Sequence, residues 1–210
     1  MELLGFFASA WVTLFVVVDP LAAVPVFLTM TAADSGAARR ITARRAALVA
    51  AGILVVFAVF GGLVFRLLGV SLAAFQIAGG LLLLLLATDM LRAERSRQRT
   101  TPEEVAEGAV KDDVSVFPLA IPMLAGPGAT SAVMVLSARS LDVPHAVAFG
   151  VALVLVVLAT YLILRASSRI ADQLGKTGLN VLQRVMGLVV AAFAVEFVLS
   201  GLKQAFPGWG

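Results

Sequence analysis

The sequence predicts an all-α membrane protein, with six transmembrane helices arranged as two inverted three-helix repeats and with discontinuous first and fourth helices. Three observations support this fold class. The chain has 210 residues, 60% of them hydrophobic, and a mean hydropathy of +1.01, which is far more apolar than a soluble domain. It aligns with itself when it is shifted by 107 residues. Proline interrupts an apolar segment at the same point of each half.

Long apolar segments predict the individual helices, because roughly 20 helical residues cross the hydrocarbon core. The opening segment, residues 3–33, contains Asp19 as its only charge. A segment near the end, at about 181–202, contains only Arg184 and Glu196. The other four segments contain no Asp, Glu, Lys or Arg, and they are residues 46–65, 67–88, 114–138 and 143–164.

The opening segment is expected to remain in the mature protein. Residues 8–10, Ala-Ser-Ala, resemble a signal-peptide cleavage site. A signal peptide begins with positive charge, however, and its apolar core is at least about 7 residues long. Here the start carries Glu2, and only residues 3–7 precede the Ala-Ser-Ala sequence.

The basic residues predict the orientation of the helices. With six spans, 13 of the 16 Lys and Arg fall on one side of the membrane and three on the other. The positive-inside rule makes the richer side cytoplasmic, which places both termini outside. The 13 residues are Arg39, Arg40, Arg44, Arg45, Arg92, Arg95, Arg97, Arg99, Lys111, Arg165, Arg169, Lys176 and Arg184, and the three are Arg66, Arg139 and Lys203.

The internal match divides the chain into a first three-helix repeat at residues 1–91, a cytoplasmic linker at 92–113 and a second repeat at 114–210. Each repeat has an odd number of spans, so the second enters the membrane with the opposite polarity, as in many secondary transporters. The polar and helix-breaking pairs that match are Pro20 with Pro127, Gln76 with Gln183, Gly80 with Gly187 and Asp89 with Glu196.

The first helix is expected to break at Asp19-Pro20. As one helix, residues 3–33 would be about 46 Å long, compared with a hydrocarbon core of roughly 30 Å. Asp at the N-cap followed by Pro at the first helical position is a strong signal for a helix start. We therefore predict two half-helices, at about residues 3–18 and 21–31.

The fourth helix repeats this arrangement within "PLAIPMLAGPGATSA", residues 118–132. Gly126 takes the cap position, Pro127 the first helical position, and Gly128 leaves the approach free of a side chain. Backbone groups released inside a membrane must line a cavity or be buried in protein. The two breaks therefore predict a polar pocket between the repeats, near the middle of the bilayer.

Such a pocket suits a small zwitterion. Each new helix N-terminus offers free N–H donors and about half a positive charge, which favours a carboxylate. Asp19 supplies a negative charge for an ammonium group, or it carries a coupling proton. The candidate substrate-binding residues are Asp19, Pro20, Leu21, Ala22, Gly126, Pro127, Gly128, Ala129 and Thr130.

These motifs resemble the MarC family of bacterial integral membrane proteins, which is related to archaeal neutral amino acid transporters. The resemblance covers essentially the whole chain, and one departure is Ala22, where the family often has glycine. It implies a bacterial or archaeal cytoplasmic (inner) membrane protein and proton-coupled transport of small neutral amino acids. The segments that carry it are "DPLAAVPVF" (19–27), "PLAIPMLAGPGATSAV" (118–133) and "FQIAGGLLLLLLATDML" (75–91).

Other polar residues have less specific roles. Glu196 lies about 10 Å inside the outer end of its span and is a second candidate for proton coupling. Asp89 is expected at the cytoplasmic interface, where Arg92 is close enough to pair with it. Gln76 and Gln183 are expected to form hydrogen bonds between helices.

Several function classes are excluded because the sequence lacks the residues and motifs that they need. The sequence has no cysteine, no Gly-x-Ser-x-Gly elbow, no phosphate-binding glycine motif and a single histidine at a predicted span entrance, His145. We therefore expect no enzyme activity, no cofactor, no metal and no ATP-driven pump. The pI near 10 reflects loops that set orientation, so nucleic acid is not expected as a partner.

The expected function is therefore a transporter of glycine- or alanine-sized neutral amino acids by alternating access, with the lipid bilayer, the substrate and a coupling proton or cation as partners. Two alternatives stay open at this point: an exporter of other small amphiphilic metabolites or drugs, and a membrane scaffold or channel that does not transport by alternating access. The direction of transport, the coupling ion and a homo-oligomeric state are also left open by the sequence.

Overall fold

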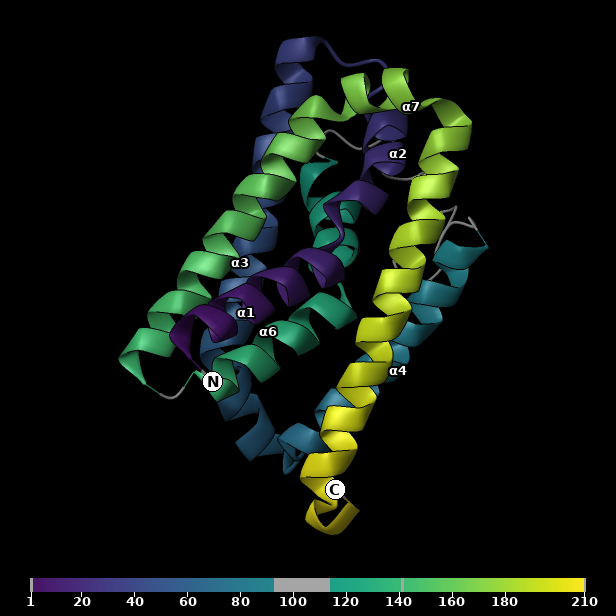
Figure 1. The fold of residues 1–210 in the computed structure, drawn as a ribbon. Helices are drawn as coiled ribbons and strands as arrows, with labels where there is room; N and C mark the ends of the chain where they lie inside the picture. The colour runs from purple at the N-terminus through teal and green to yellow at the C-terminus, as the bar shows by residue number, and fades with distance from the viewer. Residues whose placement is uncertain (1, 93–113, 141, 210) are drawn as a thin grey trace.

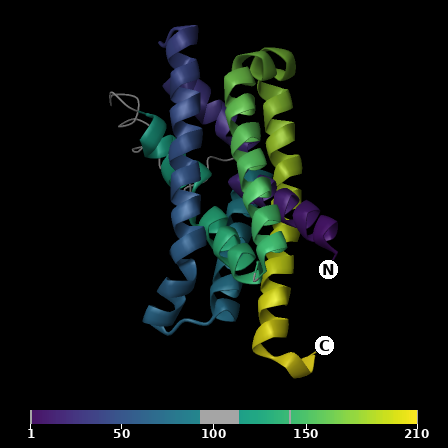
Figure 2. The ribbon, with the colours of Figure 1, turned by 90° about the vertical axis from the view of Figure 1, so that its left-hand side faces the viewer.

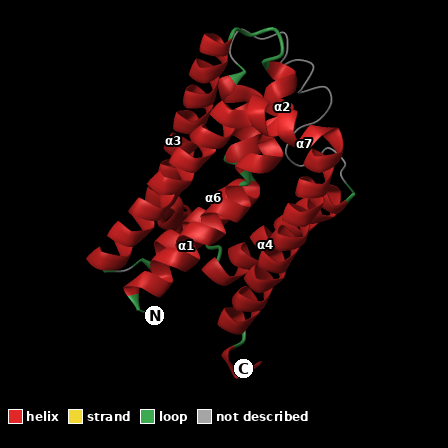
Figure 3. Ribbon diagram, turned by 45° about the horizontal axis from the view of Figure 1, so that its top comes forward, coloured by secondary structure: helices red, strands yellow, loops and turns green. Residues whose placement is uncertain are grey.

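The computed structural model describes residues 2–92, 114–140 and 142–209, so the predicted linker lies outside the described residues except for Arg92. Within these ranges every regular element is a helix, and no strand occurs (Figure 3). The elements in chain order are α1 (Leu3–Val18), α2 (Pro20–Met30), α3 (Gly36–Leu68), α4 (Leu72–Leu91), the π-helical segment η1 (Ser115–Leu124), α6 (Pro127–Arg139), α7 (Val143–Ala205) and the short 3₁₀ helix η2 (Pro207–Trp209).

Length and apolarity make these helices membrane spans. Five stretches of helix are long and apolar enough to cross a bilayer: Leu3–Met30, Gly36–Leu63, Leu72–Leu91, Val143–Gly175 and Thr177–Ala205. The pair η1 and α6 brings the number to six when it is taken as one bent span. The prediction of an all-helical membrane protein is therefore confirmed for the described residues, with about five to six spans where the sequence predicts six.

Helix α7 supplies the last two spans. Its backbone is helical throughout, apart from Gly175, which has φ 60° and ψ −178°. Glycine enters this region without the steric penalty of a Cβ, so the helix reverses direction here. In Figure 1 the first limb of α7 rises beside α3, crosses the top and descends as the second limb beside α4. The charged residues expected between the spans are thus part of the helix itself.

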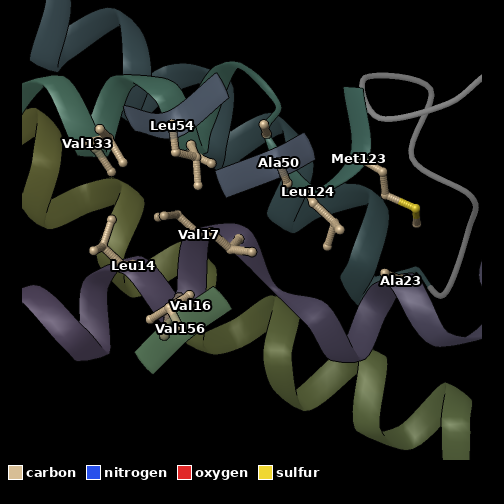
Figure 4. Packing of buried hydrophobic residues seen from close by; sticks show 14 of the residues in the cluster. Leu14, Val16, Val17, Ala23, Ala50, Leu54, Met123, Leu124, Val133 and Val156 are labelled. Carbon is tan, nitrogen blue, oxygen red and sulfur yellow. The ribbon is translucent and has the colours of Figure 1, made fainter. Parts of the chain in front are cut away.

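The short helices lie between the long ones. Figures 1 and 2 show α2 and α6 among α3, α4 and the two limbs of α7, whereas the first part of α1 projects beyond the long helices. Side chains from these elements form one buried apolar cluster around the end of α1 (Figure 4). It includes Leu14 and Val17 of α1, Leu54 of α3 and Val133 of α6. The fold therefore holds the α1–α2 junction at its centre.

The outer faces of the long helices are apolar as well. Val59 of α3, Val154 of the first limb of α7 and Leu188 of the second limb each expose about two thirds of their surface. A soluble monomer rarely leaves so much apolar surface uncovered. These faces fit the hydrocarbon of a lipid bilayer.

Two glycines let α4 pack closely against the second limb of α7. A Cβ placed on Gly80 would lie 2.8 Å from the carbonyl oxygen of Ala194, and one on Gly187 would lie 3.2 Å from the carbonyl oxygen of Ala87. Small residues allow this approach of two backbones in a membrane, where dispersion contacts drive helix association. No larger side chain fits at Gly80 without a shift of the backbone.

Candidate functional site

The junction of α1 and α2 is a break of one residue. Asp19 has φ 47° and ψ 64°, the left-handed region, which non-glycine residues seldom adopt except for Asn and Asp. Its N–H donates to the carbonyl oxygen of Phe15 at 3.0 Å and ends α1, while its Oδ1 accepts the N–H of Ala22 at 3.3 Å and caps α2. Pro20 occupies the first position of α2, where an N–H group would have no partner within the helix, so proline loses no hydrogen bond there.

Asp19 is completely buried. Its exposed fraction is 0%, and Val17 and Val18 before it and Ala23 and Val24 after it are buried too. An ionisable group at this depth of a membrane protein is expensive, which makes a functional role the default interpretation. The carboxylate therefore sits in a closed site, held by the helix start that it caps.

The second break is wider than the Gly-Pro pair predicts. Phe117 and Ile121 have extended backbone angles near φ −125° and ψ 127° inside η1. Each precedes a proline, whose ring disfavours the helical region for the residue before it. The chain then bends by 62° between η1 and α6. This span thus has three irregular points, two of them inside η1, compared with one in α1–α2.

The start of α6 has no side-chain cap. Gly126 is the N-cap residue and Pro127 occupies the first turn, as the sequence predicts. Because glycine has no side chain, the N–H groups of Gly128 and Ala129 receive no capping oxygen from it, unlike the N–H of Ala22 at the start of α2. An uncapped helix N-terminus favours a negatively charged group.

A small cavity adjoins this helix start. Gly126, Pro127, Gly128 and Ala129 line it together with Val17 of α1, two residues before Asp19. Its volume is about 20 Å³, room for about one water molecule. The end of α1 and the start of α6 therefore line one small space, which is too small for an amino acid in this conformation.

Leu83 of α4 limits that space. A Cβ placed on Gly128 would lie 2.4 Å from Leu83 Cδ2, and Leu83 itself is fully buried. Gly128 adds no side chain of its own, but the side chain of Leu83 occupies the space that the sequence predicts to be free. Neither Leu83 nor Met123, which also lines the cavity, was indicated by the sequence, because both lie within uniformly apolar stretches.

The other predicted amides lie in a separate place. Leu21 and Ala22 line a second small cavity, of about 10 Å³, against Gln183 and Met186 of the second limb of α7. The structure therefore brings the predicted residues together in two groups, one at each helix start.

Three further candidates are placed as follows. The hydroxyl of Thr130 donates to the carbonyl oxygens of Gly126 at 3.1 Å and Pro127 at 3.0 Å, so it is satisfied within its own helix. Glu196 is exposed on the second limb of α7 and is not part of the buried site around Asp19. Gln76 is buried, and its Oε1 lies 3.5 Å from a guanidinium nitrogen of Arg139, a long contact between α4 and α6.

No cluster of three or more His, Asp or Glu that could hold a metal ion occurs among the described residues. The polar groups at the two helix starts are the Asp19 carboxylate and backbone amides. Groups of this kind can hold the charged ends of a small molecule.

Comparison with known proteins places the chain in a family. The sequence matches the description "MarC family integral membrane protein" over residues 4–206. It is 39% identical to the UPF0056 membrane protein YvbG of Bacillus subtilis over 97% of both chains, and 35% identical to the UPF0056 membrane protein YhcE of Escherichia coli over 94% of this chain and 92% of that one. An archaeal relative, the UPF0056 membrane protein MJ1677 of Methanocaldococcus jannaschii, is 36% identical over 96% of this chain and 98% of that one.

No solved structure matches the chain. The family match covers both helix breaks and all the spans described above, and relatives occur in bacteria and archaea. The chain belongs to the MarC family of multi-pass integral membrane proteins.

Proposed function

We propose that this protein is a secondary transporter of small neutral amino acids, of glycine or alanine size, that works by alternating access and is coupled to protons. Two observations carry the proposal: the Asp19 carboxylate is fully buried at a helix break, and the uncapped start of α6 lines a cavity with Val17, two residues before Asp19. One group suits an ammonium end and the other a carboxylate end. In this proposal the protein carries out no catalytic reaction and needs no cofactor.

The difference between the two helix starts supports this assignment of roles. The start of α2 already holds a carboxylate, because the N–H of Ala22 donates to Asp19. The start of α6 holds none from its cap residue, and its amides at Gly128 and Ala129 line a cavity. The substrate carboxylate would therefore bind at α6, and Asp19 would face the amino group or carry the proton.

The small size of this cavity supports a conformation without bound substrate. A space of about 20 Å³ does not admit even glycine, so substrate entry requires the two halves to move apart. Leu83, which packs on Gly128, is the side chain that such a movement would displace. A narrow site also favours a small substrate over the larger amphiphiles of the alternative exporter hypothesis.

We further propose that the two halves are inverted repeats with discontinuous first and fourth helices. The contacts of α4 with the second limb of α7 support this. The amide nitrogen of Val198 lies 3.0 Å from a Cβ placed on Gly80, and the amide nitrogen of Leu91 lies 3.0 Å from one placed on Gly187. Adding 107 to the number of Gly80 gives Gly187, and subtracting 107 from that of Val198 gives Leu91. The two contacts are therefore equivalent, as a two-fold relation between the halves requires.

The proposed topology places the arginine-rich ends of the helices in the cytoplasm and both termini outside, in an inner membrane. In Figure 1 the start of α3 and the bend of α7 lie at the top, whereas α1 begins and α7 ends toward the bottom. Both ends of the described chain thus point away from the arginine-rich end.

Counterflow in proteoliposomes tests the proposal. Vesicles loaded with unlabelled glycine or alanine should accumulate the labelled amino acid transiently above equilibrium, and an inward proton gradient should change the rate. A channel gives no such overshoot, and a scaffold gives no flux at all. If larger amphiphiles support counterflow and glycine and alanine do not, the exporter alternative replaces this proposal.

A further inference from the structure

Four arginines surround a pocket at the arginine-rich end of the fold. Arg39 and Arg40 come from the first turns of α3, and Arg165 and Arg169 come from the first limb of α7, shortly before the Gly175 bend. The pocket has a volume of about 500 Å³, and none of its lining residues is acidic. It is much larger than the two small cavities at the helix starts, and unlike them it is lined by charged residues.

Arg39 is the fixed member of this group. Its guanidinium donates to the hydroxyl of Ser168 at 2.8 Å and to the carbonyl oxygen of Thr31 at 2.9 Å, which ties α3 to α7 and to the end of α2. Its Nε is buried and has no hydrogen-bond partner. One arginine is thus held in place by its neighbours and keeps a donor unused.

The other three arginines supply unneutralised charge. Arg40, Arg165 and Arg169 are exposed, and within the described part of the chain none of them forms an ion pair. Guanidinium groups match phosphate oxygens in geometry and often bind them through two hydrogen bonds. The lining of the pocket therefore suits a phosphate-bearing anion.

An apolar groove continues from the pocket along α7. Phe7 and Trp11 of α1 line it together with Leu155, Leu158 and Leu162 of α7, and its volume is about 310 Å³. Leu162 also lines the arginine pocket, so the two spaces meet at this residue.

The α7 residues of both spaces, apart from Ser168, form a single face of the helix. They are Leu155, Leu158, Ala159, Leu162, Arg165, Ala166 and Arg169, and each lies three or four residues from another member of this set. Residues at this spacing lie above one another on a helix. The face runs about 21 Å along the helix axis, from charge at one end to apolar side chains at the other.

We propose that this face binds an anionic phospholipid, with its phosphate on the four arginines and one acyl chain in the groove toward Phe7 and Trp11. Basic pockets between helices at the cytoplasmic surface bind anionic headgroups in other membrane proteins. Free phosphate would use the arginines but leave the groove empty. The joining of charge and groove at Leu162 favours the lipid. This site is independent of the proposed transport.

The test measures lipid binding to the full chain in neutral detergent. Phosphatidylglycerol is titrated against the melting temperature, with phosphatidylcholine of the same chains and inorganic phosphate as comparisons. Phosphatidylglycerol should stabilise the protein at lower concentration than either, since a ligand of the folded state raises its stability in proportion to occupancy. Equal effects of the two lipids would overturn the proposal. A phosphate effect as large as that of phosphatidylglycerol would assign the pocket to a free anion instead.

Two pairs of variants locate the binding. The double variant Arg165→Gln/Arg169→Gln should bind phosphatidylglycerol roughly 30-fold more weakly, because each arginine near an anionic lipid contributes about 1 kcal/mol. The control Arg44→Gln/Arg184→Gln removes the same charge from exposed residues outside the pocket and should bind as the wild type does. Equal weakening in both would mean that only the total charge matters, and the pocket would be refuted.

A further variant tests the groove. Ala159→Phe fills part of it, and displacing two methylene groups of the lipid at about 0.8 kcal/mol each weakens binding by about tenfold. Ala192→Phe adds the same side chain at an exposed position of the second limb and should leave binding unchanged. If Ala159→Phe binds phosphatidylglycerol as tightly as the control does, the acyl chain does not lie in this groove.

Discussion

Gly80 of α4 and Gly187 of α7 stand in reciprocal positions where their helices cross. A Cβ placed on Gly80 would meet the carbonyl oxygen of Ala194 at 2.8 Å, and one placed on Gly187 would meet that of Ala87 at 3.2 Å. A step of 107 residues, the register found in the sequence, turns each contact into the other. The backbones of the two proposed repeats thus approach each other at matched points.

This contact predicts that both glycines are required for stability. Gly80→Ala and Gly187→Ala should each lower the free energy of unfolding by about 1–3 kcal/mol, because the added methyl meets backbone atoms that cannot rotate away. Thermal unfolding in detergent measures the loss. Gly52→Ala is the control, since no atom lies within 4 Å of a Cβ there. It should be neutral or slightly stabilising, as alanine is the better helix former. Equal losses at all three positions would contradict the close contact.

A second prediction separates the charge of Asp19 from its role in the backbone. Asn adopts the left-handed region and caps helices nearly as well as Asp, so Asp19→Asn should fold with a melting temperature close to that of the wild type. Without the carboxylate it should show no proton-driven transport. Counterflow with and without a pH gradient measures this. Unchanged, gradient-driven flux in Asp19→Asn would remove Asp19 from the mechanism.

Asp19→Ala should be less stable than Asp19→Asn, because alanine neither caps the helix nor readily adopts the left-handed conformation. The lost cap costs about 1 kcal/mol and the left-handed conformation about 1–2 kcal/mol more. Asp19→Gly restores the backbone freedom but not the cap, so its stability should lie between those of Asp19→Ala and Asp19→Asn. The order of the three melting temperatures tests whether Asp19 contributes both the helix cap and the left-handed conformation.

Local chemistry made the helix starts predictable from the sequence. Asp19-Pro20 and Gly126-Pro127 act through caps and a missing N–H, which depend on neighbours in the chain alone. The bend at Gly175 and the irregular backbone at Phe117 are less evident. Charges after a span suggest a loop, yet they are equally compatible with a helix that extends past the membrane, as α7 does.

The sequence could not predict that a leucine of α4 fills the space beside Gly128. Residues 81–86 are six consecutive leucines, so their sequence does not distinguish the face that packs inward from the faces that meet lipid. Only Leu83 and Leu86 of this run are buried in the structure. Which leucine meets Gly128 is decided by the packing of α4 on α6, and hydrophobic periodicity, the main signal for a buried face, is absent here.

A third prediction concerns this contact between Leu83 and Gly128. Gly128→Ala should destabilise the protein by about 1–3 kcal/mol through overpacking, and Leu83→Ala by about 2–5 kcal/mol through a cavity. Because the smaller side chain makes room for the added methyl, the double variant should be more stable than the sum of the two losses predicts. Residues in contact couple by about 0.5–3 kcal/mol in such cycles.

The control for that cycle is Gly62→Ala combined with Leu83→Ala. A Cβ on Gly62 has no atom within 4 Å, so the two changes should add without coupling. Additive losses for Gly128→Ala and Leu83→Ala would show that the two residues do not touch. Counterflow by Gly128→Ala should also be slower than by Gly62→Ala, since only the former narrows the proposed carboxylate site.

The last prediction concerns pH and the start of α7. Asp142 caps this helix: its Oδ1 accepts the N–H of His145 at 2.9 Å and also contacts the ring Nδ1 of His145. These hydrogen bonds, the backbone one first, lower the pKa of the Asp142 carboxyl below its usual value of 3.8. His145 packs edge-on against Phe6 at 4.9 Å between ring centroids, so the cap also supports the contact between α7 and α1.

A carboxyl whose pKa is lower in the folded state stabilises that state above its unfolded pKa and loses this effect as the pH falls through the folded pKa. Asp142→Ala should therefore melt below the wild type at neutral pH, and the gap should narrow as the pH falls below about 4. Melting temperatures of both proteins between about pH 7 and pH 3 measure the gap. A gap that stays constant over this range would mean that the Asp142 carboxylate contributes nothing as a charged cap.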